Sequence, residues 1–220
     1  MLRWLQSSGN GQTARTAQEE PVDEQSCPGM ARALERILSK EEQPEVLDLG
    51  QHSRSAAVYL ANRGARVCVD AFVPPPETPK KKKGQDDSDV EKTPVVLAHE
   101  DKKFDLVLAW EHWDFIPPDR LADFAAEVDR VLAPGGLLVM YCRDAGQASD
   151  VLQEQPASYR LTADDKVIRE QDTGPTRPRW GHQNRKIEQA LAPLSVQSIH
   201  LQRNRIREFL VRKPDKKRKP

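Results

Sequence analysis

The sequence contains little cysteine and no cluster of metal-binding side chains. Only three of the 220 residues are cysteines, and no pair has the C-x-x-C spacing typical of zinc and redox sites. Cys68 and Cys142 lie inside apolar runs, where a thiol packs as a small hydrophobic group. The five histidines are scattered along the chain. We therefore expect neither a disulfide scaffold nor a metal site.

Long hydrophobic runs are also missing. The longest plainly apolar run covers residues 137–142, far below the ~18–20 residues that a membrane-spanning helix needs. The first residues lack the continuous apolar stretch of a secretory signal. We therefore expect a cytoplasmic protein. Hydrophobic residues make up 37% of the chain, against roughly 45–50% in globular domains, which indicates that part of the chain lies outside the core.

The formal net charge of zero hides an asymmetry. Residues 1–164 contain 19 Lys and Arg against 28 Asp and Glu, whereas residues 165–220 contain 15 against 6. The lysine run from Lys80 to Lys83 and the basic tail, residues 214–220, would give a weak contact with nucleic acid or with another protein. The alternative is that both runs are solvated, which the lack of interleaved aromatic residues favours.

Three segments have the composition of irregular chain. Residues 1–28 lack any apolar period and predict a flexible N-terminal arm. Residues 73–93 combine prolines, lysines and acidic residues, and predict a disordered charged loop. The tail at 214–220 cannot bury any surface. Residues 29–213 are then expected to form one domain that contains the charged loop.

Within this domain, strand-like and helix-like patterns alternate. A strand at 45–50, a helix ending at Gly64 and a strand at 66–72 predict a βαβ unit. Further strands are expected at 94–98, 104–110 and 136–142, with a helix between 118 and 132. Two hairpins follow, one over 158–170 and one over 195–212. The pattern predicts an α/β fold, a Rossmann-like, mostly parallel sheet with a C-terminal antiparallel hairpin.

Three strings in this order resemble the class I S-adenosylmethionine-dependent methyltransferases, over roughly residues 30–213. The first is VLDLGQHSRS, which stands where that family has its glycine-rich loop and contains Asp48 and Gly50. The second is Asp70, twenty residues beyond Gly50. The third runs from Phe104 to Tyr141 and includes the turn LAPGG.

The resemblance implies an S-adenosylmethionine cofactor and a set of site residues. Asp48 and Gly50 would form the cofactor loop, and Asp70 would hydrogen-bond the ribose. His99, Glu100 and Asp101 compete for the adenine amine, with Asp101 taken as the cofactor-binding candidate. Trp110 would stack on a ring, although aromatic residues at this position more often pack in the core. His112 is the nominated catalytic base.

Two bulky residues replace the later glycines of the loop, namely His52 and Arg54. They would crowd the cofactor or contact it. The first hypothesis is therefore a methyltransferase-like enzyme acting on an unidentified acceptor. The alternative is an inactive pseudo-methyltransferase that serves as a protein- or RNA-interaction module, and a third is a plain RNA-binding accessory protein. A basic and aromatic cluster would hold an anionic substrate. This cluster comprises Arg177, Arg179 and Trp180.

Overall fold

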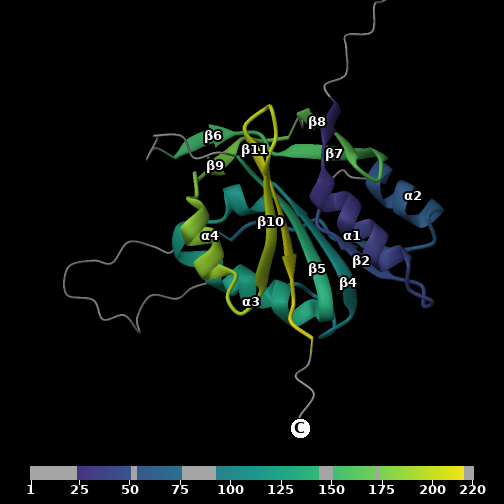
Figure 1. The fold of residues 1–220 in the computed structure, drawn as a ribbon. Helices are drawn as coiled ribbons and strands as arrows, with labels where there is room; N and C mark the ends of the chain where they lie inside the picture. The colour runs from purple at the N-terminus through teal and green to yellow at the C-terminus, as the bar shows by residue number, and fades with distance from the viewer. Residues whose placement is uncertain (1–23, 51–53, 76–92, 144–150, 172–173, 216–220) are drawn as a thin grey trace, which may run out of the picture.

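Figure 1 shows the computed structural model, which describes residues 24–50, 54–75, 93–143, 151–171 and 174–215. His52, most of the charged loop with its lysine run, and the tail from residue 216 lie outside the described residues, as do residues 1–23. In the described ranges, no helix has the length and apolar composition to span a bilayer.

A six-stranded sheet forms the centre of the fold, with the strand order β10–β11–β5–β4–β2–β3. Strands β3, β2, β4 and β5 are parallel, and the hairpin β10–β11 adds to β5 in the antiparallel direction. This confirms the predicted α/β sheet and its C-terminal hairpin. The strands are β2 (Glu45–Asp48), β3 (Arg66–Val69), β4 (Phe104–Trp110), β5 (Leu132–Arg143), β10 (Ser195–Leu201) and β11 (Ile206–Arg212).

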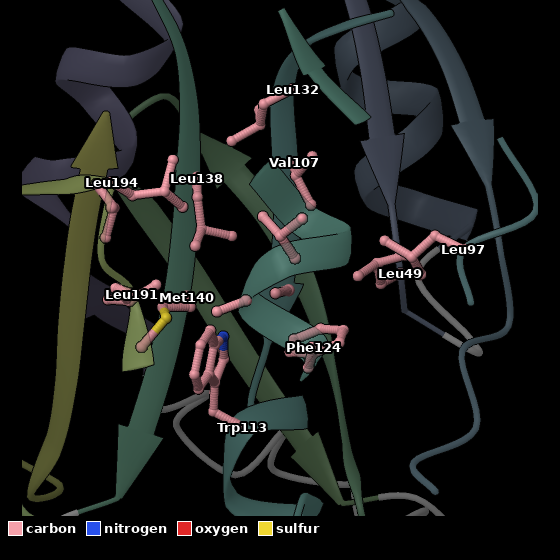
Figure 2. Packing of buried hydrophobic residues seen from close by; sticks show 14 of the residues in the cluster. Leu49, Leu97, Val107, Trp113, Phe124, Leu132, Leu138, Met140, Leu191 and Leu194 are labelled. Atoms are coloured by element: carbon pink, nitrogen blue, oxygen red, sulfur yellow. The ribbon is translucent and has the colours of Figure 1, made fainter. Parts of the chain in front are cut away.

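Two pairs of helices pack on opposite faces of this sheet. The helices are α1 (Pro28–Leu38), α2 (Arg54–Asn62), α3 (Leu121–Val131) and α4 (Asn184–Ala190). Buried residues of α1 and α2 belong to one hydrophobic cluster, and those of α3 and α4 belong to the other. Figure 2 shows the second cluster, where the ring of Trp113 points toward Met140 of β5 and Phe124 lies beside Trp113. Both faces of the parallel strands are therefore covered, as apolar runs of this kind require.

Helix α1 begins with a proline, which suits the first helical position because its missing N–H has no partner there. No side chain at its N-cap satisfies the next free N–H groups. Instead, the buried carboxylate of Glu208 in β11 accepts the N–H of Gly29 at 2.8 Å and of Met30 at 2.9 Å. This contact joins the start of the domain to its last strand.

The strand predicted at residues 94–98 is wrong, because this segment forms no strand in the structure. Side chains of α3 bind its backbone instead. Glu127 accepts the N–H of Leu97 at 2.9 Å, while Arg130 donates to the carbonyls of Leu97 and His99, each at 2.7 Å. A buried backbone needs hydrogen-bond partners from some source, and here α3 supplies them. Strand β3 is consequently an edge of the described sheet.

Two smaller sheets lie across the carboxyl ends of β4 and β5, at the top of Figure 1. The hairpin predicted over 158–170 is confirmed as β7–β8. The boundary predicted for the N-terminal arm at residue 28 is wrong, since a strand at 24–26 pairs with β8. The strands are β1 (Glu24–Ser26), β6 (Leu152–Glu154), β7 (Ala157–Ala163), β8 (Lys166–Gln171) and β9 (Arg177–Arg179).

Candidate functional site

Asp48 ends the first parallel strand, β2, and is fully buried. Its Oδ1 accepts the N–H of Gly50 at 2.9 Å and the indole Nε1–H of Trp110 at 2.6 Å. The neighbouring strands β2 and β4 therefore meet at their carboxyl ends through one carboxylate. This is the edge at which open α/β sheets bind ligands, and two of the predicted cofactor residues contact Asp48 there.

Trp110 lies at the end of β4 with a φ of 40°, a left-handed conformation that bulky residues rarely adopt. Its ring stacks on Tyr159 of β7, with the ring centroids 5.0 Å apart and the planes 6° apart. Tyr141 of β5 stacks in turn on Tyr159 at 5.0 Å. The stacking predicted for Trp110 thus occurs with protein side chains, and the hairpin β7–β8 is packed against the end of β4.

A buried ion pair joins the same hairpin to the next residue, Glu111. Arg169 of β8 donates to its two carboxylate oxygens, through Nε at 2.7 Å and Nη2 at 2.9 Å. The hydroxyl of Tyr159 donates to Glu111 Oε1 at 2.6 Å. Because Glu111 is 3% exposed, breaking this pair would leave a buried charge, which typically costs 3–5 kcal/mol. These contacts hold the hairpin in place.

Among the described residues, a small cavity lies between β4 and the hairpin. Its volume is about 20 Å³, enough for about one water molecule. Its walls include Gly50, Trp110, His112, Tyr159 and Arg177. The crowding predicted from Arg54 is not tested, because no side-chain position is described for this first residue of α2. The described crowding comes from Trp110 and Tyr159.

His112 lies beside the small cavity, and its ring nitrogen Nε2 donates to the carbonyl of Leu49 at 2.6 Å. The proton on Nε2 leaves Nδ1 as the acceptor of this neutral ring. Burial lowers the pKa of His112 to about 4. A general base works best with a pKa near the operating pH, so this imidazole is a weak base at neutral pH.

A larger groove, here called the Asp70 groove, opens beyond the end of β3 and has a volume of about 430 Å³. Asp70 lines it with a side chain that is 34% exposed. Phe72 and Val95 supply apolar parts of its wall. The Nε2 atom of His99 lies 3.1 Å from Asp70 Oδ2. The groove therefore combines apolar side chains with an accessible carboxylate.

Other predicted site residues lie away from both spaces. Asp101 is 66% exposed and pairs with Arg130 at 2.7 Å, and it is absent from the described linings of the groove and the cavity. Arg179 is 9% exposed and lies 3.1 Å from Glu154 of β6. Trp180 is also buried. These contacts connect β9 to its neighbours, so the cluster that was expected to hold an anionic substrate has a packing role at Arg179 and Trp180.

Sequence analysis missed the role of Tyr159 and Arg169. The signal available was the alternation of β7, in which Tyr159 and Leu161 are buried and their neighbours are less so. That pattern shows that the hairpin has an inner face, although it does not show what the face contacts. Among the described residues, no group of His, Cys, Asp and Glu side chains is arranged to hold a metal ion.

Comparison with known proteins agrees with this geometry. Residues 47–140 match the family described as the methyltransferase domain. The chain has the class I methyltransferase fold. The solved 1,6-didemethyltoxoflavin-N1-methyltransferase of Burkholderia thailandensis, with bound 1,6-didemethyltoxoflavin and S-adenosylhomocysteine, is 16% identical, with a TM-score of 0.50 over 86% of this chain and 77% of that one. A protein of Pyrococcus horikoshii is 18% identical, with a TM-score of 0.50 over 84% of this chain and 90% of that one. A sequence search of curated proteins gave no match.

The methyltransferase fold implies S-adenosylmethionine, and the residues fit its two halves differently. The Asp70 groove, at about 430 Å³, has the size of common ligand pockets, roughly 300–1,000 Å³, and offers a carboxylate to a diol and an apolar wall to a flat ring. The small cavity of about 20 Å³ admits no methionine chain. In the described conformation the adenosine half fits and the methionine half does not.

Proposed function

We propose that this chain is an S-adenosylmethionine-dependent methyltransferase that acts on an unidentified acceptor. The observation that carries the proposal is the Asp70 groove at the carboxyl edge of a methyltransferase-type sheet. Asp70 would accept hydrogen bonds from the ribose hydroxyls, while Phe72 and Val95 would pack against the adenine. The cofactor would supply an electrophilic methyl group, and the protein's part is to bind and orient it.

This proposal requires the hairpin β7–β8 to move away from Trp110, since the small cavity leaves no room for the rest of the cofactor. The contacts that would have to break are the stack of Tyr159 on Trp110 and the ion pair between Glu111 and Arg169. Both belong to one hairpin, which also contacts the rest of the domain, since β8 pairs with β1 and Asp164 in the turn accepts hydrogen bonds from Tyr59 and Arg63. We therefore expect the opening to be a rotation of the hairpin about these contacts, with the six-stranded sheet unchanged.

Calorimetric titration with S-adenosylmethionine and S-adenosylhomocysteine tests the proposal. Asp70→Asn should weaken binding of either ligand by about tenfold or more, because a hydrogen bond to a charged group is worth ~1.5–3 kcal/mol. Asp101→Asn is the matched control, since its carboxylate pairs with Arg130 and should leave affinity within about twofold. Equal losses in the two variants, or binding that is insensitive to both, would contradict the assignment of the groove.

The second candidate function is an inactive pseudo-methyltransferase that serves as an interaction module. The closed cavity favours it, and so does the low pKa of His112, which leaves no strong base beside Trp110. A bound ligand at a hundredfold over its Kd raises the free energy of unfolding by roughly 2.7 kcal/mol. If millimolar S-adenosylmethionine gives no change in melting temperature, the inactive candidate replaces the enzyme.

A further inference from the structure

A further concave site lies near the end of β5, here called the arginine hollow. Its volume is about 160 Å³, and its described lining residues are Arg143, Arg169, Asn204 and Ile206. Arg143 is the last residue of β5, and Arg169 belongs to β8. Asn204 lies in the turn before β11, and Ile206 is the first residue of β11. Three elements that are distant in sequence thus bring two guanidinium groups and one carboxamide to the same space.

The polar residues of this hollow have hydrogen-bond donors to spare in the described part of the chain. Arg169 uses Nε and Nη2 for Glu111, which leaves Nη1. Arg143 uses Nη1 for Glu154, which leaves Nε and Nη2. Asn204 Oδ1 accepts the N–H of Ile206 at 3.2 Å, which leaves its amide NH₂ group. The available atoms are all donors, and donors of this kind match the oxygens of an anion.

The charge around the hollow is also positive. Two further arginines contact residues around the hollow, since Arg207 donates to the Arg143 carbonyl at 2.8 Å and Arg179 lies 3.1 Å from Glu154, the partner of Arg143. The carboxyl groups that pair with these arginines are Glu111, Glu154 and Asp114. Burial raises the pKa of the third acid, Asp114, to about 8, so it is mostly neutral at pH 7. Four guanidinium groups therefore lie near three carboxyl groups, so positive charge is in excess even if Asp114 is counted as charged, and the excess attracts anions.

We propose that the arginine hollow is a binding site for a small oxyanion, either the carboxylate or the phosphate group of a ligand. A volume of about 160 Å³ is below the roughly 300–1,000 Å³ of pockets that hold whole drug-sized ligands, so it suits a single anionic group. Arg169 also binds Glu111, whose residue lines the small cavity. The ion pair between Arg169 and Glu111 thus separates the hollow from the small cavity and fixes one wall of the hollow.

This anion site goes beyond the proposed function and does not rest on it, because the hollow is present in the described conformation. The site is therefore tested on the full chain without cofactor. Isothermal titration calorimetry with inorganic phosphate, and separately with acetate, is run at constant ionic strength maintained with chloride. A preference for phosphate or for acetate shows which oxyanion the hollow takes.

Asn204→Asp is the sharpest variant, because it keeps the side-chain shape and the oxygen that accepts the Ile206 N–H. It replaces the spare NH₂ group with a negative charge. We expect it to weaken oxyanion binding by about tenfold or more, since it removes one donor to a charged group and adds repulsion. Its S-adenosylhomocysteine affinity should stay unchanged, which separates this test from that of the proposed function.

Arg143→Gln provides a second measurement, and Glu154 keeps Arg179 as a partner in this variant. Its matched control is Arg160→Gln, which removes an arginine paired with Glu170 at 3.1 Å on the hairpin, outside the described lining of the hollow. We expect weaker oxyanion binding for Arg143→Gln and unchanged binding for Arg160→Gln. The proposal is overturned if the wild-type chain binds neither anion, or if Asn204→Asp binds as well as the wild type.

Discussion

Replacing Tyr159 with phenylalanine should destabilise the protein more than the same replacement at Tyr59. Both hydroxyls donate to a carboxylate at nearly the same distance. Tyr159 donates to Glu111 at 2.6 Å, and Tyr59 donates to Asp164 at 2.7 Å. The two bonds differ in burial, since Tyr159 is 2% exposed whereas the Asp164 side chain is 37% exposed. The Tyr59 hydroxyl also accepts from Arg63 at 3.2 Å, so a larger loss at Tyr159, in spite of this extra bond at Tyr59, would show the contribution of burial at the hairpin.

The expected magnitudes follow from these surroundings. A hydrogen bond to a charged group contributes ~1.5–3 kcal/mol, and Glu111 keeps two bonds from Arg169 when the Tyr159 hydroxyl is removed. We therefore expect the lower end, about 1.5 kcal/mol, for Tyr159→Phe. The exposed pair at Tyr59 should contribute about 0.5 kcal/mol. For a chain of this size, 1.5 kcal/mol lowers the melting temperature by roughly 3–6 °C.

Urea unfolding of the two variants and the wild type measures the difference, with an unchanged m-value as the sign that only stability has changed. Burial raises the pKa of Tyr159 well above its usual value near 10. The stabilisation is therefore complete below about pH 10 and is lost as the pH rises further, because the unfolded chain ionises first. Equal losses of stability for Tyr159→Phe and Tyr59→Phe would refute the view that the hairpin is held by a buried, charged hydrogen bond.

Two further predictions concern the pH dependence of stability. Burial raises the pKa of Asp114 from 3.8 to about 8, so the stability that its protonated form contributes at low pH is lost as the pH rises. Relative to Asp114→Asn, the wild type should lose about 4 kcal/mol of unfolding free energy between pH 5 and pH 8. Urea unfolding measures this loss, and parallel pH profiles of the two proteins would contradict the prediction. Burial lowers the pKa of His112 from 6.5 to about 4, so the protein loses stability as the pH falls and the unfolded chain takes up a proton. Between pH 7 and pH 5, the wild type should lose about 2 kcal/mol of unfolding free energy relative to His112→Gln. Urea unfolding measures this loss as well, and an unchanged difference between the two proteins would contradict a neutral, buried ring.

The sequence predicted the parallel strands and the long helix well, because those signals are local. Residues 104–110 form a continuous apolar run, and the stripe from Leu121 to Val131 repeats with the helical period. The strand predicted at residues 94–98 was wrong because that prediction also rested on a local pattern alone. Its apolar pattern is that of a strand, yet its backbone partners are Glu127 and Arg130, which no local pattern specifies.

The candidate site was predictable only in part. The chain order placed Asp48, Gly50, Asp70 and Trp110 at the carboxyl edge of the sheet, because parallel strands end on the same side. Asp101 also follows a predicted strand, but its carboxylate pairs with Arg130 of α3. Spacing along the chain cannot distinguish an acid that faces a groove from one that pairs with a helix.

The sequence by itself determined the α/β alternation, the βαβ unit and the family to which the opening strands are similar. The tertiary structure alone decided that the hairpin β7–β8 folds back onto β4, that Tyr159 fills the space beside Trp110, and that Arg143 and Arg169 share one hollow. The physical reason is the separation along the sequence between the residues that interact. Backbone periodicity is set by neighbouring residues, whereas the position of a hairpin depends on contacts between residues such as Glu111 and Arg169, which are 58 positions apart.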